Sequence, residues 1–545
     1  MRTETTYDLA GRITTQKVVP PNAADEAQTT TYTHDDEGRV LTVSLGNTVL
    51  ASAAYDSAGE PASVRYAGGS SLVSIGKDAA GRVVSQSWKT SDGAQVDSTV
   101  SRTRAATIVD ESLGGVDARP GGPNYVYDAA GRLTEAWVVG HHYTYDFTSN
   151  APSACPAGTQ SNAGLNTNRV RLLDETPSGV TETGYCYDAA DRLLGTVGAI
   201  AVSDVRYDDN GNTTQYTTGG STTHLSWDGA DRNIAVRVTG ADPAHVSYIR
   251  DATDRIVRRQ ATQGDATTSV QYGYTGSGDT ADLTLGSDNR MMSRSISLPG
   301  GALYTWKPDT FTLDHPTVHG DLALTTSADG KQTGALRTYT PFGEPVKFDG
   351  VIDTDDVPDN MPGQMDNGWL GEHQRLYEHA GGLSIVQMGA HPYSPLLGRF
   401  LSVDPVEGGS ANDYEYTAAD PVNLTDLDGR AIWVPITLAC VRFCAAAGRA
   451  VQAARTVKYS GSLFRKPVVG VGSRLFGNKT IQGGRMGLLN HKKLPVRVGW
   501  NVISTKPLGF KGGLAAFRIV AGRGKNAWHR DLFYGRVSIR GRWLE

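Results

Sequence analysis

The sequence predicts a mainly β protein: a long array of β-hairpins, followed by a small α+β domain at the C-terminal end. Three observations carry this prediction. A six-residue turn motif recurs through the first half of the chain. Glycine reaches 64 residues while apolar residues make up only 39%, which is typical of turn-rich β-structure. The net charge also changes sign near the end of the chain. Its length of 545 residues, which is more than one core usually serves, agrees with a division into domains.

The turn motif is clearest in YDAAGR, residues 127–132. Adjacent copies are mostly about 20 to 27 residues apart, which indicates a repeat array. Longer gaps indicate decayed copies, for example around Tyr143 to Asp146. The nine recognisable copies contain Asp8, Asp35, Asp56, Asp78, Asp128, Asp188, Asp208, Asp228 and Asp251.

Each copy is followed by an alternating run such as RLTEAWVV, which predicts a strand with one buried face. The aromatic residue before the Asp is expected to pack on that face. The Asp side chain can cap the turn, and Gly or Asp at the fifth place tolerates the left-handed conformation that closes a hairpin. One hairpin cannot bury its own face, but a stack of hairpins can. We therefore interpret these residues as structural.

This repeat resembles the YD repeats of the RHS family, over about residues 1–429. The resemblance implies that residues 1–335 form a β-sheet that spirals into a hollow RHS shell, or cocoon. Residues 336–429 are similar to the RHS repeat-associated core, which plugs such shells. The matching stretches are TYTPFGEPV (338–346), WLGEHQRLYEHAGGLSIVQMGAHPYSPLLGRFLSVDP (369–405) and GGSANDYEYTAADPVNLTDLDG (408–429).

In many members of that family the core cuts the chain just after its last motif, with two aspartates that act as an aspartyl-protease-like pair. The matching motifs put these roles on Asp404 and Asp426, and the cut near Gly429 or Arg430. Two carboxyl groups held close share a proton, so that one acts as a base toward water and the other as an acid. The alternative is that both are turn residues beside Pro and Gly, where Asp is common.

The core also departs from the family pattern. HPYSP at residues 391–395 stands where the family has Arg-Tyr-Tyr-Asp-Pro, and DLDGR at 426–430 stands where it has DPxGL. The altered junction is the main argument against self-cleavage.

Residues 430–545 carry 22 lysines and arginines against two acids, Asp531 and Glu545. Their net charge of +20 leaves −25 on the rest of the chain, since the whole carries −5. Such a basic domain suggests a polyanionic partner. By position, the resemblance implies that residues 430–545 are the variable cargo of a polymorphic toxin. Within them, residues 430–458 are expected to be helical, and the Gly-punctuated runs from Pro467 onward to form a small sheet.

Two acidic residues exclude several chemistries. ADP-ribosyl transfer needs a catalytic Glu, zinc deaminases need Glu beside Cys and His ligands, and two-metal nucleases need several carboxylates. A metal-free ribonuclease needs only a base, an acid and cations, so no metal or cofactor is expected. Its candidate catalytic residues are His491, His529 and Asp531, the last two sharing one face of a strand. The candidate RNA contacts are Lys492, Lys511, Arg518, Arg530 and Arg536, with Trp500 and Trp528 as base-stacking residues.

The sequence thus favours a secreted or cell-surface bacterial toxin delivered into competitor cells, with RNA, a cognate immunity protein and a delivery machinery as partners. Two other hypotheses stay open. In the first, residues 431–448 insert into a membrane after release, which is a transient membrane contact. In the second, the chain is a non-enzymatic surface or adhesion repeat protein.

The first residues have no apolar signal core and begin inside a repeat, so we expect an N-terminally truncated chain. Four cysteines make no disulfide framework, and an unpaired state of Cys155 and Cys186 is favoured over a bond.

Overall fold

The computed structural model describes residues 1–276, 278–406 and 410–430, and the backbone of five strands between residues 468 and 537. The chain divides into two compact units, Met1–Cys440 and Val441–Glu545. Nearly all regular structure in the described residues is antiparallel β, and within each sheet the paired strands are consecutive in the sequence. This meander follows from the repeat, because every turn motif joins two consecutive strands.

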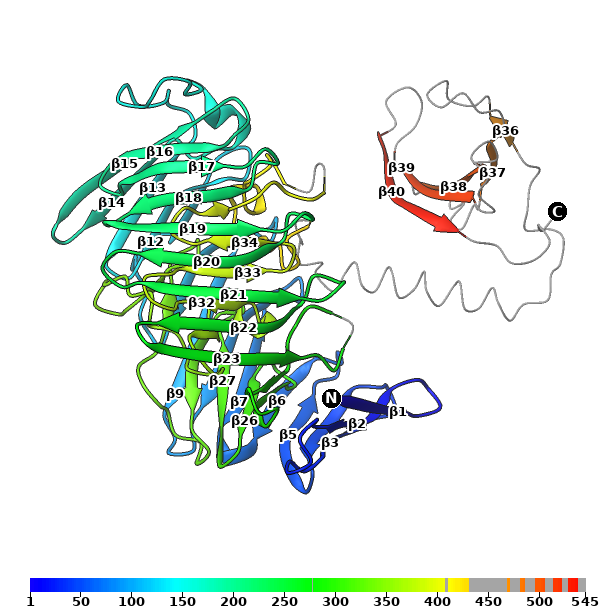
Figure 1. Ribbon diagram of the computed structural model, residues 1–545. Helices are drawn as coiled ribbons and strands as arrows, with labels where there is room; N and C mark the ends of the chain where they lie inside the picture. The colour runs from blue at the N-terminus through cyan, green and yellow to red at the C-terminus, as the bar shows by residue number, and fades with distance from the viewer. Residues whose placement is uncertain are drawn as a thin grey trace. The chain divides into compact units, whose positions relative to one another are not determined.

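Three large sheets form the wall of the first unit (Figure 1). The first contains β1 (Arg2–Tyr7), β2 (Ile13–Val19), β3 (Gln28–His34), β4 (Val40–Leu45), β5 (Thr48–Tyr55), β6 (Pro61–Tyr66), β7 (Ser71–Lys77), β8 (Val83–Lys89), β9 (Gln95–Arg102) and β10 (Ile108–Leu113). The second contains β11 (Tyr125–Tyr127), β12 (Leu133–Val138), β13 (His141–Asp146), β14 (Arg171–Thr176), β15 (Gly179–Tyr187) and β16 (Leu193–Gly198). The third contains β17 (Val202–Tyr207), β18 (Thr213–Thr218), β19 (Ser221–Trp227), β20 (Asn233–Thr239), β21 (Ala244–Arg250), β22 (Ile256–Gln263), β23 (Ala266–Gly273), β24 (Leu283–Leu285), β25 (Met291–Ser297), β26 (Leu303–Lys307), β27 (Thr310–Pro316) and β28 (Leu322–Thr326).

The segment that follows the wall has shorter elements. It contains β29 (Thr338–Tyr339), β30 (Pro345–Val346), β31 (Met365–Asn367), β32 (Leu376–Glu378), β33 (Ile385–Met388), β34 (His391–Ser394) and β35 (Arg399–Phe400). Four 3₁₀ turns lie in the first unit: η1 (Ala67–Gly69), η2 (Ala163–Asn166), η3 (Gly371–His373) and η4 (Thr417–Ala419). The five-stranded sheet of the second unit contains β36 (Val468–Gly470), β37 (Ile481–Arg485), β38 (Val496–Ser504), β39 (Gly513–Ala521) and β40 (Trp528–Val537).

The repeat motif forms the turn that the sequence predicts. In YDAAGR, Asp128 Oδ1 accepts the amide N–H groups of Ala130 at 2.8 Å and Arg132 at 3.0 Å, and Oδ2 accepts Arg132 Nε at 2.7 Å. Gly131, at the fifth place, has a φ of 86°. Where the fifth residue is Asp, it has a left-handed φ as well, as the sequence also predicts: Asp191 (59°), Asp231 (57°) and Asp254 (73°).

The aromatic residue of the motif links successive repeats through a hydrogen bond that the sequence did not predict. Its polar tip donates to the main-chain carbonyl of the residue that follows the preceding turn. Tyr207 donates to Leu193 O at 3.0 Å, and Trp227 Nε1 donates to Thr213 O at 2.8 Å. A buried aromatic side chain removes apolar area from water, and the hydrogen bond at its polar tip also fixes the orientation of the ring. Tyr55, Tyr127 and Tyr274 donate in the same way to Val40, Ile108 and Ile256.

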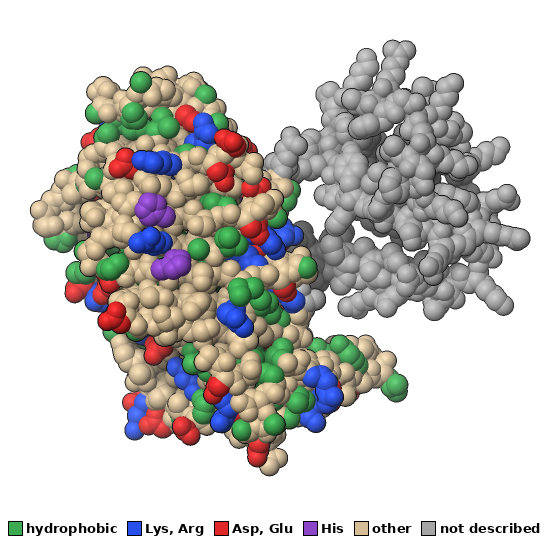
Figure 2. Space-filling view, viewed as in Figure 1, with side chains coloured by type: hydrophobic (Ala, Val, Ile, Leu, Met, Phe, Trp, Pro, Cys, Tyr) green, Lys and Arg blue, Asp and Glu red, His purple; other side chains and the backbone are tan. Residues whose placement is uncertain are grey.

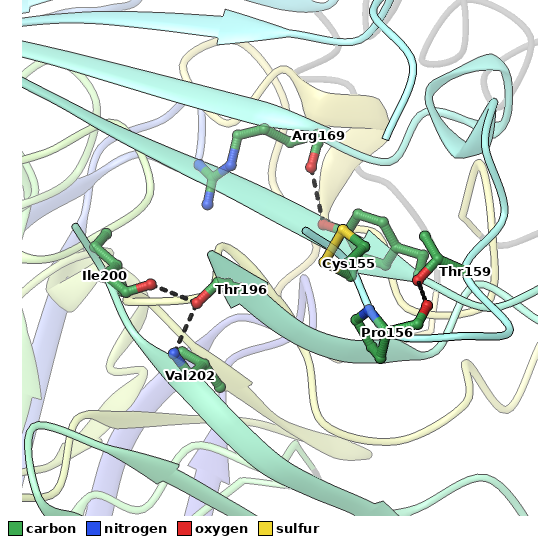
Figure 3. Close-up of a disulfide and its surroundings, with 9 residues drawn as sticks. Cys155, Pro156, Thr159, Arg169, Thr196, Ile200 and Val202 are labelled. Atoms are coloured by element: carbon green, nitrogen blue, oxygen red, sulfur yellow. Dashed lines mark hydrogen bonds between the residues drawn. A yellow bond between two sulfur atoms is a disulfide. The ribbon is translucent and has the colours of Figure 1, made fainter. Parts of the chain in front are cut away.

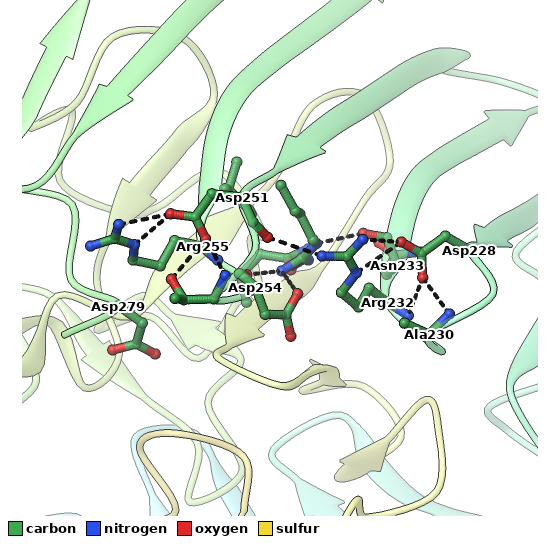
Figure 4. Close-up of polar contacts among 12 residues, drawn as sticks. Asp228, Ala230, Arg232, Asn233, Asp251, Asp254, Arg255 and Asp279 are labelled. Atoms are coloured by element: carbon green, nitrogen blue, oxygen red, sulfur yellow. Dashed lines mark hydrogen bonds and ion pairs between the residues drawn. The ribbon is translucent and has the colours of Figure 1, made fainter. Parts of the chain in front are cut away.

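The arginine of the motif links the turns along the edge of the wall (Figure 4). Arg232 Nε donates to Asp228 of its own turn at 2.8 Å, and its Nη1 donates to the main-chain oxygen of Asp251 in the next turn at 3.0 Å. Arg250 replaces the aromatic residue of that next copy, and its Nε donates to Asn233 O at 2.8 Å. The hydrogen bond to the residue after the preceding turn is therefore kept in a copy that has no aromatic residue.

The first sheet also packs against the last strands of the third. Trp88 on β8 is buried, and its Nε1 donates to Pro316 O at the end of β27 at 3.0 Å. Tyr66 OH donates to Pro299 O at 2.7 Å. One buried apolar cluster joins Val43, Leu50, Val64, Leu72 and Trp88 to Ile296, Tyr304, Leu313 and Leu324. The wall is closed by this contact, which removes apolar area from water on both sheets.

The segment after the wall, residues 338–430, is anchored to the third sheet. Figure 1 shows β32 to β34 behind β18 to β21, and Arg259 on β22 forms a bidentate ion pair with Glu378 on β32, at 2.6 and 2.7 Å. The two side chains are 1% and 0% exposed. Tyr248 OH also donates to Glu378 Oε2 at 3.0 Å. Bidentate geometry with a further donor is what a buried charge pair needs to be tolerated.

Cys155 and Cys186 form a disulfide, which corrects the expectation that they are unpaired (Figure 3). Cys186 lies on β15, and Cys155 lies in the long loop between β13 and β14. The expectation failed because the repeats are decayed in this region, so spacing did not indicate that the loop folds back onto β15. Figure 2 shows a face of the wall on which uncharged groups cover most of the area, with single Lys, Arg, Asp and Glu side chains scattered between them. Its strands are rich in Thr and Ser, and Thr217 bonds to Thr222 across β18 and β19 at 2.9 Å.

Candidate functional site

Asp404 is buried in the loop that follows β35, although Pro405 and Val406 beside it are exposed. Its side chain accepts the amide N–H of Val406 at 2.8 Å on Oδ1 and the hydroxyl of Ser410 at 2.7 Å on Oδ2. Its own N–H donates to Asp413 O at 2.8 Å. Burial raises the pKa of Asp404, the two hydrogen bonds oppose this, and the negative charges of Asp413 and Asp428 raise the pKa further. A carboxyl with a raised pKa is a better proton acceptor when it is ionised.

Asp426 is fully buried in the last turn that the structure describes in the first unit. Its Oδ1 accepts the amide N–H of Arg430 at 3.1 Å. That nitrogen belongs to the peptide bond between Gly429 and Arg430, the bond at which the sequence predicts a cut. Asp426 therefore lies at the atom that must gain a proton when this bond is hydrolysed.

The junction DLDGR has the spacing of the repeat turns, with Asp, Gly and Arg in the same places as in DAAGR. Gly429 has a φ of 62°, and the contact from Asp426 to Arg430 N corresponds to that from Asp128 to Arg132 N. The guanidinium group of Arg132 donates to the Asp of its own turn, whereas the interaction described for Arg430 is made with a residue of the wall. The positive charge of Arg430 acts on Asp254 of the wall, where it lowers the pKa against the larger effect of burial.

Arg375 fixes the residues just before the junction. Its Nη1 donates to Leu427 O at 2.7 Å, and its guanidinium group forms an ion pair with Asp279 at 2.8 Å. Ala390 N, in the turn between β33 and β34, donates to Asp428 O at 3.1 Å. The sequence did not point to Arg375, because its partner carbonyl is 52 residues away and a carbonyl carries no sequence signal.

The fit around Gly429 leaves no room for a side chain. A Cβ at this position would lie 2.2 Å from Met388 O and 2.6 Å from His391 Cδ2. The junction is therefore held by main-chain contacts and by shape, and only glycine satisfies both the space and the positive φ.

Both predicted aspartates lie in the segment after the wall, residues 338–430. The side-chain hydrogen bonds of Asp404 run to its own loop, and the Asp426 carboxyl accepts the amide N–H of Arg430 at the junction. The negative charge of Asp428, two residues after Asp426, acts on Asp404. The action of Asp404 and Asp426 as one acid–base pair stays a prediction.

The candidate residues of the basic domain fall into two groups. His491, Lys492 and Lys511 lie outside the described residues, as does the expected helix at 430–458, except for Arg430 itself. Seven others lie on three neighbouring strands whose backbone is described: Trp500 on β38, Arg518 on β39, and Trp528, His529, Arg530, Asp531 and Arg536 on β40.

The register places two of these strands side by side. His529 is opposite Val520, and Asp531 is opposite Arg518. The irregularity between β39 and β40 falls at Phe517/Arg518. His529 and Asp531 therefore stay two residues apart on one continuous stretch of β40.

In the part of the chain that the structure describes, no helix has the length and hydropathy of a membrane span. The same residues contain no group of three or more His, Cys, Asp or Glu side chains placed to hold a metal ion. The apolar stretch 431–448 lies outside the described residues.

The fold is a wall of YD-repeat hairpins followed by residues 338–430, which pack on its third sheet, and this arrangement is similar to an RHS-type shell. Among solved structures, the chain is similar to a TcdB2–TccC3–TEV protein, with a TM-score of 0.56, 16% identity and 78% of this chain covered, against 21% of that one. It is also similar to TccC3 in the Tc holotoxin pore of Photorhabdus luminescens, carrying the TccC3 mutation D651A, with a TM-score of 0.51, 15% identity and the same coverage of both chains. The predicted mainly β shell is confirmed.

Two curated relatives are the tRNA3(Ser)-specific nuclease WapA of Bacillus spizizenii and the tRNA nuclease WapA of Bacillus subtilis. Each is 26% identical to this chain, over 256 and 257 residues. These matches cover 46% of this chain and 10% of each relative, so the chain spans about a tenth of the relatives that it matches. No family model matches the chain.

Proposed function

We propose that this chain is part of a bacterial polymorphic toxin, in which an RHS-type shell encloses the basic domain and releases it by hydrolysis of the peptide bond at Gly429–Arg430. One observation carries the proposal: the Asp426 carboxyl contacts the nitrogen of that bond. The position supports it too, because the junction separates an acidic shell from a domain with 22 basic residues and two acids.

The cleavage needs one water molecule and one shared proton. Water adds to the carbonyl carbon of Gly429 while the Asp404 carboxylate takes a proton from it. Asp426 gives its proton to the nitrogen of Arg430. The carbon–nitrogen bond then breaks and leaves a carboxyl group at Gly429 and an amine at Arg430. The pair of aspartates keeps one proton throughout, as an aspartyl-protease-type pair does.

The released domain is proposed to be a metal-independent ribonuclease. The names of the WapA relatives as tRNA nucleases support RNA as the substrate. His491 and His529 serve as the acid and the base, Asp531 orients His529, and the basic residues bind phosphates. A cognate immunity protein and a delivery machinery are the expected partners. The disulfide supports passage through an oxidising compartment, because such bonds are rare in reducing cytosol.

Intact mass of the purified chain tests the cleavage. We expect two fragments that separate between residues 429 and 430, and a single full-length species for Asp404→Asn and for Asp426→Asn. A wild-type chain that stays full-length contradicts the proposal.

Inducible expression of residues 431–545 tests the activity separately. RNA is expected to be degraded while the membrane potential and the DNA stay intact, and His529→Ala is expected to restore the RNA. Early depolarisation would favour a membrane-active toxin instead, and normal growth would favour a non-enzymatic surface protein.

A further inference from the structure

Residues 148–162, which we call the strap, form most of the loop between β13 and β14 and lie on one face of β15 (Figure 3). The residues of β15 beneath the strap are small. A Cβ on Gly184 would lie 2.3 Å from Pro152 Cγ, and Cys186 forms the disulfide with Cys155. Gly184 and Cys186 are two residues apart on the strand, so they share the face that the strap covers.

The strap has few other ties to the wall. Its sequence, TSNAPSACPAGTQSN, contains no apolar side chain larger than proline, and none of these residues belongs to a buried apolar cluster of the described chain. Among the described hydrogen bonds, one joins the strap to β15: Gln160 N–H donates to Tyr187 O at 2.6 Å. A segment that buries so little apolar area gains little free energy to offset the entropy lost on ordering it.

The chain on either side of the strap is anchored without the disulfide. Phe147, just before the strap, and Ala163, just after it, are buried members of the large apolar cluster of the wall. Arg132 of the YDAAGR turn donates to Gly164 O at 3.0 Å. The strap can therefore open as a local event while the strands around it stay folded.

The disulfide is accessible at one of its two sulfur atoms. Cys155 is partly exposed, and its neighbours Ala154 and Pro156 are exposed, whereas Cys186 is completely buried. A thiol reductant therefore meets the bond at Cys155 Sγ. Its thiolate forms a bond to this sulfur while the bond to Cys186 breaks, and the Cys186 thiolate takes a proton from solvent. A second thiol of the reductant then releases Cys155 as a thiol, so that two electrons pass from the reductant to the protein.

We propose that the disulfide between Cys155 and Cys186 is a reduction site, and that the strap is a redox-controlled cover of β15, closed while the bond is intact and open after a thiol has reduced it. The bond favours the closed strap because it restricts the conformations of the open one. A chain that passes from an oxidising compartment into a reducing cytosol meets both conditions. The inference depends neither on the proposed self-cleavage nor on the proposed ribonuclease activity.

Native-state hydrogen exchange of the full chain, before and after treatment with dithiothreitol, measures the opening. The reporters are the amide N–H groups of Gln160 and of Ala151, which donates to Ser161 O within the strap at 2.8 Å. The reference is the amide N–H of Tyr185 on β15, which donates to Val170 O at 2.9 Å. We expect reduction to raise the exchange rate of the two reporters at least about tenfold and to leave that of Tyr185 unchanged.

A variant without the bond separates its loss from other effects of the reductant. Cys155→Ser is expected to show the fast exchange of the reporters without dithiothreitol, and no further change when it is added. Iodoacetamide labelling of the treated wild type, followed by peptide mapping, shows whether Cys155 has been reduced and distinguishes it from Cys440 and Cys444.

Three results would overturn this inference. Equal exchange of the reporters in the oxidised chain and in a chain labelled at Cys155 would show that the strap stays closed without the bond. A folded chain that takes no label at Cys155 after dithiothreitol would show that the bond is not a reduction site. Faster exchange of Tyr185 together with the reporters would show that the disulfide stabilises the wall as a whole.

Discussion

The carboxyl group of Asp426 lies 3.1 Å from the amide nitrogen of Arg430, the same contact that closes the turns of the wall. In Asp128 and Arg132 of YDAAGR the corresponding distance is 3.0 Å. The junction thus uses the turn of the repeat in a more buried setting, where its Asp is 0% exposed. A repeat turn needs the Asp contact and a glycine with a positive φ, whereas the junction is also closely packed around Gly429.

Substituting the glycine of each turn tests whether the packing around Gly429 adds to the requirement for a positive φ. Gly131 has a φ of 86° and nothing within 4 Å of its Cβ direction, so Gly131→Ala introduces backbone strain alone. We expect it to lower the free energy of unfolding by about 1–2 kcal/mol. Gly429→Ala adds an overlap with Met388 O, at 2.2 Å, which costs about 1–3 kcal/mol more.

Urea unfolding at pH 7 measures both glycine variants. The cleavage assay is expected to show a slower cut in Gly429→Ala and an unchanged rate in Gly131→Ala. Equal losses of stability in the two variants would show that the contacts around Gly429 are loose.

The Asp of a repeat turn is expected to stabilise the wall only while it is ionised. Burial alone would raise the pKa of Asp251, but hydrogen bonds from Thr253 and Arg255 lower it to about 2. An Asp whose pKa is lowered by folding stabilises the protein above pH 4, and the contribution is lost as the pH falls toward 2. Asp251→Asn should therefore reduce stability at pH 5 and have a smaller effect near pH 2.

Urea unfolding of the wild type and Asp251→Asn across this range gives the difference. Asp209, an exposed residue of another turn, provides the control, because Asp209→Asn is expected to change stability little at any of these pH values. A constant difference for Asp251→Asn between pH 2 and 5 would contradict the prediction.

Local pattern was enough to predict the turns, because every group that closes them lies within four residues of the Asp. The fifth-place residue has a positive φ in copies with Gly and in copies with Asp, as at Gly131 and Asp191. The fold class followed from these turns, since each one joins two neighbouring strands.

The contacts across the shell could not be predicted in this way. Arg375 and Leu427 are 52 residues apart, and Arg259 and Glu378 are 119 residues apart. Neither pair belongs to a periodic pattern. The candidate aspartates were found through motif resemblance, but His391 was seen only as a departure from that motif. Its contact with Gly429 could not be predicted, because it depends on how the folded chain brings this glycine beside the ring.

A buried acid of the wall is expected to give the opposite pH dependence from Asp251. Burial raises the pKa of Asp314, on β27, to about 6, although Thr325 and Asn360 donate hydrogen bonds to it. The native state therefore binds a proton more tightly than the unfolded chain does, and stability falls as the pH rises from 4 to 6. Asp314→Asn should remove this loss.

The measured quantity is the difference in unfolding free energy between Asp314→Asn and the wild type. It should move in favour of the variant by about 2 kcal/mol between pH 4 and pH 7, because one pKa unit corresponds to about 1.4 kcal/mol. A difference that is independent of pH would show that Asp314 is ionised in the folded protein at both ends of this range.

The ion pair between Arg259 and Glu378 should be the strongest single link between the wall and residues 338–430. Both side chains are buried, so removing one partner leaves an uncompensated charge in the interior. We expect Arg259→Met and Glu378→Gln each to lower the free energy of unfolding by about 3–5 kcal/mol. The double variant should lose less than the sum, because it leaves neither charge unpaired.

A double-mutant cycle in urea measures this coupling, with the exposed pair Lys331 and Asp329, 3.3 Å apart, as the control. An exposed pair contributes about 0–1 kcal/mol, so its cycle should show little coupling. If the buried pair couples residues 338–430 to the wall, Glu378→Gln should also expose the junction to limited proteolysis before the wall unfolds. Additive losses in the buried cycle would instead mean that the two charges are solvated independently and that the segment is held by its apolar contacts.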